Sequence, residues 1–114
     1  SMISVEMSVD IEDALLEAKK ITQIGIIINE MITNSMKYAF SDRSRGHIKI
    51  ESKTREGRVF LSYEDDGGGI PEGISIDTST GFGMQLMKIL VSDLRGDIRI
   101  ERNKSCKYLL EFDF

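Results

Sequence analysis

Asn29-Glu30-Met31-Ile32-Thr33-Asn34-Ser35-Met36-Lys37-Tyr38-Ala39-Phe40 combines an apolar helical face with a line of polar side chains. At about 100° per residue, a helix brings Glu30, Asn34 and Lys37 onto one stripe. Residues 24–28, which precede the stretch, are almost wholly apolar, so we expect this helix to be largely buried. Taken alone, the stripe favours a structural salt bridge between Glu30 and Lys37, or simply a solvated face, over a ligand site.

The amino-acid composition is typical of an ordinary globular domain. The chain has 114 residues, of which 40% are hydrophobic and 30% charged, and its net charge of −4 gives no overall attraction to nucleic acid or to an anionic membrane. The single Cys106 excludes an internal disulfide, and no apolar run approaches the ~20 residues of a membrane span. Ser1-Met2 is interpreted as an expression remnant, so the expected domain covers residues 3–114.

Periodicity predicts an α+β fold. Residues 3–9 alternate as a half-buried strand, whereas residues 10–20 fit either a helix capped by Asp10 or a short strand at 14–18. The central helix is expected from residue 21 or 22 to 39, before a polar loop at 41–46. Further along we predict a hairpin at residues 48–64, with its turn at 54–57, and then a long loop at 65–82. A helix is expected at 83–94, with Gly96 as the left-handed residue that ends it, and a second hairpin at 97–114. This order predicts a two-layer sandwich, with a mixed, mostly antiparallel sheet and the helices on one face.

Two glycine-rich segments point to a nucleotide. Asp65-Asp66-Gly67-Gly68-Gly69-Ile70-Pro71 places a carboxylate at a strand end, before a backbone that can come close to a flat ligand. Thr80-Gly81-Phe82-Gly83-Met84 leads into a helix N-terminus, where free N–H groups favour phosphate. Neither segment is a P-loop or a Rossmann fingerprint. Each alone is more often a turn, but in this order they outline a nucleotide site.

These motifs, with Asn29-Glu30, Asn34 and Lys37-Tyr38, resemble the Asn box and two glycine boxes of the Bergerat-fold ATPases, the GHKL superfamily. That group includes DNA gyrase, the ninety-kilodalton heat-shock chaperone, sensor histidine kinases and the mismatch-repair ATPase. The resemblance runs from about Val5 to Phe114 and is greatest to the ATP-binding catalytic domain of sensor histidine kinases with a short lid. It implies the Bergerat form of the two-layer sandwich.

The resemblance also implies a role for each motif residue. Glu30 would polarise the attacking group or a metal-bound water, Asn34 would bind Mg²⁺, and Lys37 would contact phosphate; these are the predicted catalytic residues. Asp65 would accept the adenine amino group. The implied cofactor-binding set is Asn34, Lys37, Tyr38, Asp65, Gly67, Gly69, Ile70, Gly81, Phe82, Gly83 and Met84.

Some positions depart from the family pattern. Asp66 replaces the commoner Asn and is expected to add negative charge near the nucleotide, and residues 73–80 form only a short lid. Ser105-Cys106 stands where the family often has Gly-Thr, next to the adenine carboxylate. His47, the only histidine, is predicted to be a solvated residue of an edge strand. The resemblance implies that the phosphoacceptor histidine lies on a separate helical dimerisation domain.

The function we predict from the sequence is therefore two-component signalling. The domain would bind Mg-ATP and transfer the γ-phosphoryl group to a histidine on a separate dimerisation domain of the same parent protein, with a response regulator downstream. It would be inactive as an autokinase without that domain and would work in the cytoplasm, without direct contact with membrane or nucleic acid. Two alternatives stay open: a stand-alone serine kinase of anti-sigma-factor type, and a nucleotide-binding module without catalysis.

Overall fold

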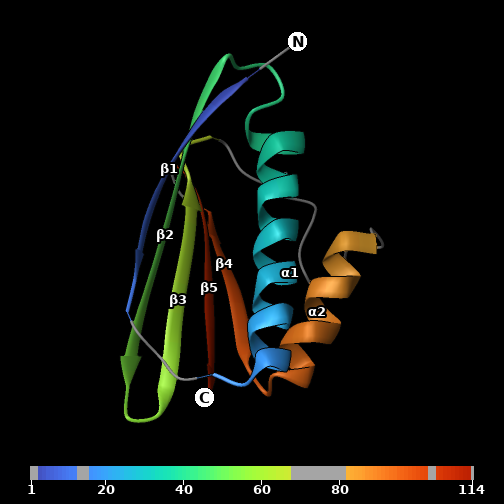
Figure 1. The fold of residues 1–114 in the computed structure, drawn as a ribbon. Helices are drawn as coiled ribbons and strands as arrows, with labels where there is room; N and C mark the ends of the chain where they lie inside the picture. The colour runs from blue at the N-terminus through green and yellow to red at the C-terminus, as the bar shows by residue number, and fades with distance from the viewer. Residues whose placement is uncertain (1–2, 13–15, 68–81, 103–104, 114) are drawn as a thin grey trace.

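The computed structural model describes residues 3–12, 16–67, 82–102 and 105–113. One five-stranded sheet in the order β1-β2-β3-β5-β4 forms the first layer, and the helices pack on one of its faces as the second (Figure 1). In chain order the elements are β1 (Ser4–Ile11), α1 (Ala18–Asn34), the π-helical turn η1 (Ser35–Ala39), β2 (Arg45–Arg55), β3 (Arg58–Asp65), α2 (Phe82–Asp93), β4 (Asp97–Arg102) and β5 (Cys106–Asp113). The predicted α+β sandwich is confirmed.

The sheet is mixed, as predicted, because β1 runs parallel to β2 while the other neighbouring strands are antiparallel. The first hairpin is tighter than the expected turn at 54–57, since strand pairing continues to Arg55 opposite Arg58. Glu56 and Gly57, the connecting residues, have φ of 52° and 77°. Two consecutive left-handed residues match the right-handed twist of the flanking strands, which explains the two-residue connection.

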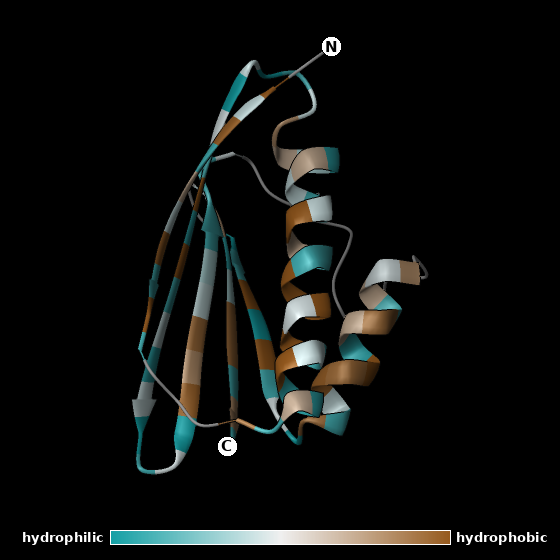
Figure 2. Cartoon of the chain, viewed as in Figure 1, coloured by the Kyte–Doolittle hydropathy of each residue, from teal (hydrophilic) through white to brown (hydrophobic). Residues whose placement is uncertain are grey.

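The core lies between the helices and the inner face of β2, β3 and β5. Apolar bands on α1 and α2 turn toward the sheet in Figure 2. Alternate residues of the central strands are buried beneath them, including Ile50, Tyr63 and Tyr108, which stand side by side in the strand register. From the helices, Met31 and Met87 are fully buried. Within the described residues, no helix is long and apolar enough to cross a lipid bilayer.

The first strand differs from its prediction. β1 pairs Met7 with Ile48 and Val9 with Ile50, so its apolar side chains point to the same face as the core. Nevertheless Met7, Val9 and Ile11 are 45%, 57% and 55% exposed. The prediction of a half-buried strand was wrong for these residues because β1 is the edge strand of the sheet. An alternating apolar pattern does not by itself ensure that a helix packs over an edge strand.

The segment that follows resolves one alternative. Asp10 lies in β1, so it does not cap a helix, and α1 begins at Ala18, a few residues before the predicted start. Residue 18 is therefore helical, so the predicted short strand at 14–18 is wrong at its last residue. Residues 13–15 lie outside the described part of the chain. The predicted helix end at Ala39 is confirmed, but η1 supplies its last five residues.

The end of α2 uses a different left-handed residue from the one expected. Arg95 has φ of 55°, and the N–H groups of Gly96 and Arg95 donate back to Val91 and Ser92, each at 3.0 Å, which is a Schellman motif. Gly96 is needed for another reason: a Cβ there would lie 2.5 Å from the carbonyl oxygen of Glu111. The glycine permits close approach of α2's end to β5.

Two glycine substitutions test this account of packing. Gly96→Ala should lower the free energy of unfolding by about 1–3 kcal/mol, because the new methyl group has no space beside β5. Gly25→Ala, on an exposed face of α1 where a Cβ meets nothing within 4 Å, should instead raise it by about 0.5–1 kcal/mol. Urea denaturation measures both; equal effects of the two changes would contradict the packing described here.

Candidate nucleotide-binding site

The candidate site is built around the buried carboxyl group of Asp65 at the end of β3. Asp65 is 2% exposed. Its Oδ2 accepts a hydrogen bond from Ser35 Oγ at 2.9 Å, and its Oδ1 accepts one from the Gly67 N–H at 3.1 Å. Tyr63 Oη lies 2.7 Å from the same serine oxygen. Since Ser35 begins η1, these bonds join the end of the central helix to the end of a core strand.

Burial dominates the electrostatics of this group. It raises the pKa of Asp65 above its ordinary value of 3.8, while the hydrogen bonds from Ser35 and Gly67 act to lower it and the charge of Asp66 acts to raise it. Burial likewise raises the pKa of the Tyr63 hydroxyl, which stays a neutral donor. Asp65 is thus a desolvated acceptor, suited to a donor on a ligand.

Asn34 is oriented by residues far away in the sequence. Its amide nitrogen donates to Tyr108 Oη on β5 at 3.4 Å and contacts Met84 Sδ on α2 at 3.9 Å. Tyr108 in turn packs edge-on against Tyr63, with ring centroids 5.6 Å apart. One turn earlier, the carboxylate of Glu30 lies against Gly83, where a Cβ would collide with Oε2. Glu30 and Asn34 therefore both lie against the first turn of α2.

The stripe is not an internal salt bridge. The ammonium group of Lys37 lies 5.0 Å from the ring centroid of Tyr38, on the exposed side of η1. Glu30 instead contacts Gly83, as described above. The interpretation of the stripe as a Glu30–Lys37 bridge was therefore wrong, because the two groups turn toward different neighbours.

Gly67 is required by a close contact with η1. A Cβ at this position would lie 2.6 Å from the carbonyl oxygen of Ala39. No other residue type fits without a shift of the main chain. The first glycine of the predicted box thus packs on the helix end that also carries Ser35.

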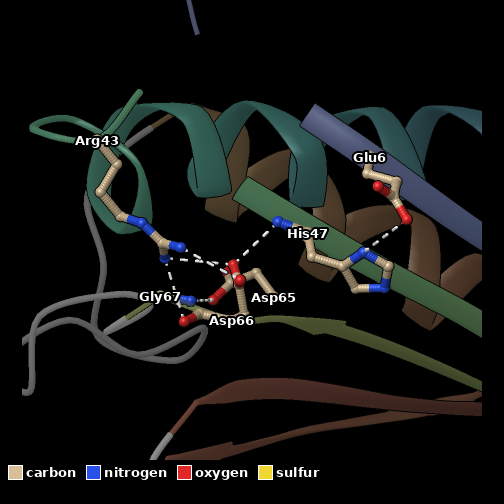
Figure 3. Close-up of polar contacts among 6 residues, drawn as sticks. All are labelled: Glu6, Arg43, His47, Asp65, Asp66 and Gly67. Carbon is tan, nitrogen blue, oxygen red and sulfur yellow. Dashed lines mark hydrogen bonds and ion pairs between the residues drawn. The ribbon is translucent and has the colours of Figure 1, made fainter. Parts of the chain in front are cut away.

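Asp66 does not present a free charge to the site. Its carboxylate accepts two bonds from Arg43, one to each oxygen at 3.2 Å, and a third from the His47 N–H at 2.9 Å (Figure 3). Desolvation works to raise the pKa of Asp66, but the His47 N–H and the Arg43 guanidinium outweigh it and hold the pKa below its ordinary value. The expected added charge is therefore largely neutralised. Sequence reasoning missed Arg43, which appeared only as part of a polar loop.

Of two further predicted positions, Cys106 is confirmed and His47 is corrected. Cys106 stands directly opposite Asp65 in the β3–β5 register and is fully buried. The prediction that His47 belongs to an edge strand was wrong, because its strand β2 pairs with β1 on one side and with β3 on the other. Its side chain is nevertheless half-exposed, with Nδ1 4.0 Å from Glu6 Oε1 and Nε2 3.3 Å from Ser8 Oγ.

Both glycine boxes are only partly described. Gly69, Ile70 and Gly81 lie outside the described residues, so their predicted roles stay predictions. The residues that follow open α2: Phe82 is 79% exposed, Gly83 half-buried and Met84 buried. Among the described residues there is no cluster of three or more His, Cys, Asp or Glu side chains that could hold a metal ion.

Sequence comparison shows the protein family to which this chain belongs. Residues 19–114 match the family described as histidine kinase-, DNA gyrase B-, and HSP90-like ATPase, HATPase_c. The chain belongs to this family of ATP-binding domains. Blue-light-activated histidine kinase 2 of Erythrobacter litoralis is 31% identical over 101 residues, which are 88% of this chain and 29% of that protein. Sensor histidine kinase PdtaS of Mycobacterium tuberculosis is 28% identical over 68% of this chain and 16% of its own length.

Solved structures show the same fold. The histidine kinase domain of the E. litoralis EL346 blue-light-activated histidine kinase superposes with a TM-score of 0.86 at 24% identity, over 96% of this chain and 54% of that one. Acinetobacter baumannii histidine kinase AdeS gives 0.76 at 19% identity, over 96% of this chain and 54% of that one. This chain thus spans about half of these structures and less than a third of the curated relatives named above.

The raised pKa of Asp65 predicts a pH dependence. Only between the unfolded-state pKa and the higher folded-state pKa does the folded protein keep a proton that the unfolded chain releases, so this contribution to stability is complete below about pH 3.9 and is lost as pH rises through the folded-state pKa. The free energy of unfolding of wild type minus that of Asp65→Asn should therefore fall as pH increases above about 4, by ~1.4 kcal/mol per unit of pKa shift. Urea denaturation at stepped pH measures this difference; a value independent of pH would contradict the raised pKa.

Proposed function

We propose that this domain binds Mg-ATP and transfers the γ-phosphoryl group to a histidine on a separate dimerisation domain of a two-component sensor kinase. The observation that carries the proposal is the buried, hydrogen-bonded Asp65 carboxyl beside Gly67, the residue to which the family resemblance assigns the adenine amino group. The relatives named as histidine kinases support the choice of acceptor.

The described residues fit Mg-ATP. Asp65 offers a desolvated acceptor to the adenine amino group, and Gly67 keeps the neighbouring backbone free of side chain. Asn34 donates its amide nitrogen to Tyr108, which leaves the amide oxygen for a magnesium ion. Bound Mg-ATP would supply the phosphoryl group and the metal charge that neutralises it during transfer.

For the remaining polar residues we propose the roles that the family resemblance implies. Lys37, on the exposed side of η1, would contact phosphate oxygens. Tyr38 would line the pocket beside it. Glu30, on α1 against the first turn of α2, would polarise the attacking histidine nitrogen. Phosphoryl transfer needs mainly such positioning and charge neutralisation.

The partners follow from the same proposal. The acceptor would be the histidine-bearing dimerisation domain of the parent protein, and a response regulator would take the phosphoryl group from it. We propose the cytoplasm as the compartment. The domain as a unit would cover residues 3–114.

A second candidate is a serine kinase of anti-sigma-factor type. The anti-sigma F factor of Clostridium novyi is 28% identical over 68% of this chain and 61% of its own length, so this relative is mostly an ATPase-like domain. The argument for a third candidate, a module without catalysis, weakens because Arg43 neutralises Asp66.

Calorimetric titration of ATP tests the site. Asp65→Ala should weaken binding by about a hundredfold with or without magnesium, because it removes a buried charged acceptor. Asn34→Ala should remove mainly the magnesium-dependent part of the affinity. Asp97→Ala, an exposed carboxylate at the start of β4, is the matched control and should bind as wild type does. No binding by folded wild type, or binding unaffected by either site variant, would contradict the proposal.

Transfer is tested by incubating the domain with γ-labelled ATP and a histidine-bearing dimerisation domain as a separate polypeptide. We expect label that is acid-labile and alkali-stable, as phosphohistidine is. Glu30→Gln should bind ATP normally but transfer about a hundredfold more slowly, because the group that assists the attacking nitrogen is lost. Acid-stable label on serine of an anti-sigma-factor antagonist would instead support the second candidate.

A further inference from the structure

The antiparallel ladder between β2 and β3 ends in an unusual way at Asp66. Ile48 pairs with Asp65, so the next pair along the strands is His47 with Asp66. The Asp66 N–H donates to the carbonyl oxygen of His47 at 3.1 Å, as in a regular ladder. The return bond is different: the His47 N–H donates to the side-chain Oδ1 of Asp66, at 2.9 Å. The aspartate side chain has taken the place of its own main-chain carbonyl.

This exchange turns the chain out of the sheet. The Asp66 carbonyl, released from the ladder, accepts a hydrogen bond from Arg43 Nη1 at 3.1 Å, and the same guanidinium holds both carboxylate oxygens. Arg43 is itself anchored, since its N–H donates to the Phe40 carbonyl at 3.1 Å and its guanidinium lies 5.3 Å from the Phe40 ring centroid. Both the main chain and the side chain of Asp66 are thus fixed.

The next residue along the chain connects this turn to the site. Gly67 donates its N–H to Asp65 Oδ1 and packs against Ala39 too closely for any side chain. The position of Gly67 depends on the direction in which the main chain leaves Asp66. Ser35 holds Oδ2 of the same carboxyl group from the other side. The orientation of the Asp65 carboxyl is therefore set at one end by η1 and at the other by Asp66.

We propose that Asp66, clamped by Arg43, is a positioning residue that orients Asp65 for recognition of the amino group of an adenine base. The inference rests on the proposed nucleotide-binding function and assigns Asp66 no contact with the ligand. An ordinary exposed ion pair contributes little, but this one also closes a strand ladder and fixes the turn beside the buried acceptor. Its loss should therefore affect base selection more than overall affinity.

The experiment compares ATP with inosine triphosphate, which has the same phosphates but a carbonyl oxygen in place of the 6-amino group. In wild type, ATP should bind more tightly. Asp66→Ala should weaken ATP about tenfold while changing inosine triphosphate by less than about twofold, because only the bond to Asp65 is misdirected. Asp66→Asn keeps an oxygen acceptor for His47 but sets an amide against Arg43, so its preference for ATP should lie between those of wild type and Asp66→Ala.

Asp113→Ala is the matched control. It removes another exposed aspartate paired with an arginine, Arg58, at the opposite end of β3, and should change neither affinity. A preference for ATP over inosine triphosphate that is unchanged in Asp66→Ala would overturn the inference. An equal loss of both affinities would overturn it as well, because that pattern describes general destabilisation.

A measurement without ligand separates this inference from the proposed function. Amide hydrogen exchange at His47 and Gly67 should be faster in Asp66→Ala than in wild type, with exchange in the core strands unchanged. Unchanged protection at both amides would refute the positioning role whether or not ATP binds. Conversely, a wild type that binds no ATP, or an Asp65→Ala variant that binds it normally, refutes the proposed function and with it the base-selection step, even if the two amides respond as expected.

Discussion

The structure depends on a carboxyl group buried where the central helix meets the end of β3. Removing Asp65 from water is costly, and the cost is offset only by donors that must be placed within hydrogen-bonding distance. Ser35 and the Gly67 N–H supply them from segments on either side. Tyr63, a core residue, hydrogen-bonds the same serine. The core and the candidate site therefore share one polar network, and neither can be rearranged alone.

The π-helical turn η1 explains how one helix contributes residues both to the core and to the candidate site. The Phe40 N–H donates to the Ser35 carbonyl at 2.9 Å, which closes the wide turn at the end of the helix. Within this turn, Ser35 meets Asp65 and Ala39 meets Gly67, while Lys37 stays exposed. Single π turns occur often at functional sites. Here the turn lies between the polar stripe of α1 and the strand end that carries the acceptor.

Asp66 shows how one substitution changes its surroundings. An Asn at this position could accept the His47 N–H, but its amide group would oppose the donors of Arg43. Asp66 and Arg43 therefore form an ion pair whose net charge is close to zero, so the local charge near the site resembles that of a neutral Asn at position 66. Asp in place of the commoner Asn therefore changes which hydrogen bonds hold the turn after β3. It is no argument against nucleotide binding.

The sequence by itself determined the order of the elements, the second hairpin and the end of the central helix, because these follow from periodicity and motif spacing within short segments. Its motifs also predict the residue types of the candidate site. It did not determine the exposure of β1, the π turn, the left-handed Arg95, or the partners of Asp65 and Asp66. Those were decided by the tertiary structure. Ser35 and Asp65 are 30 residues apart, Arg43 and Asp66 23, and Asn34 and Tyr108 74. Hydrogen bonds between such distant residues depend on how the layers pack, which no local pattern encodes.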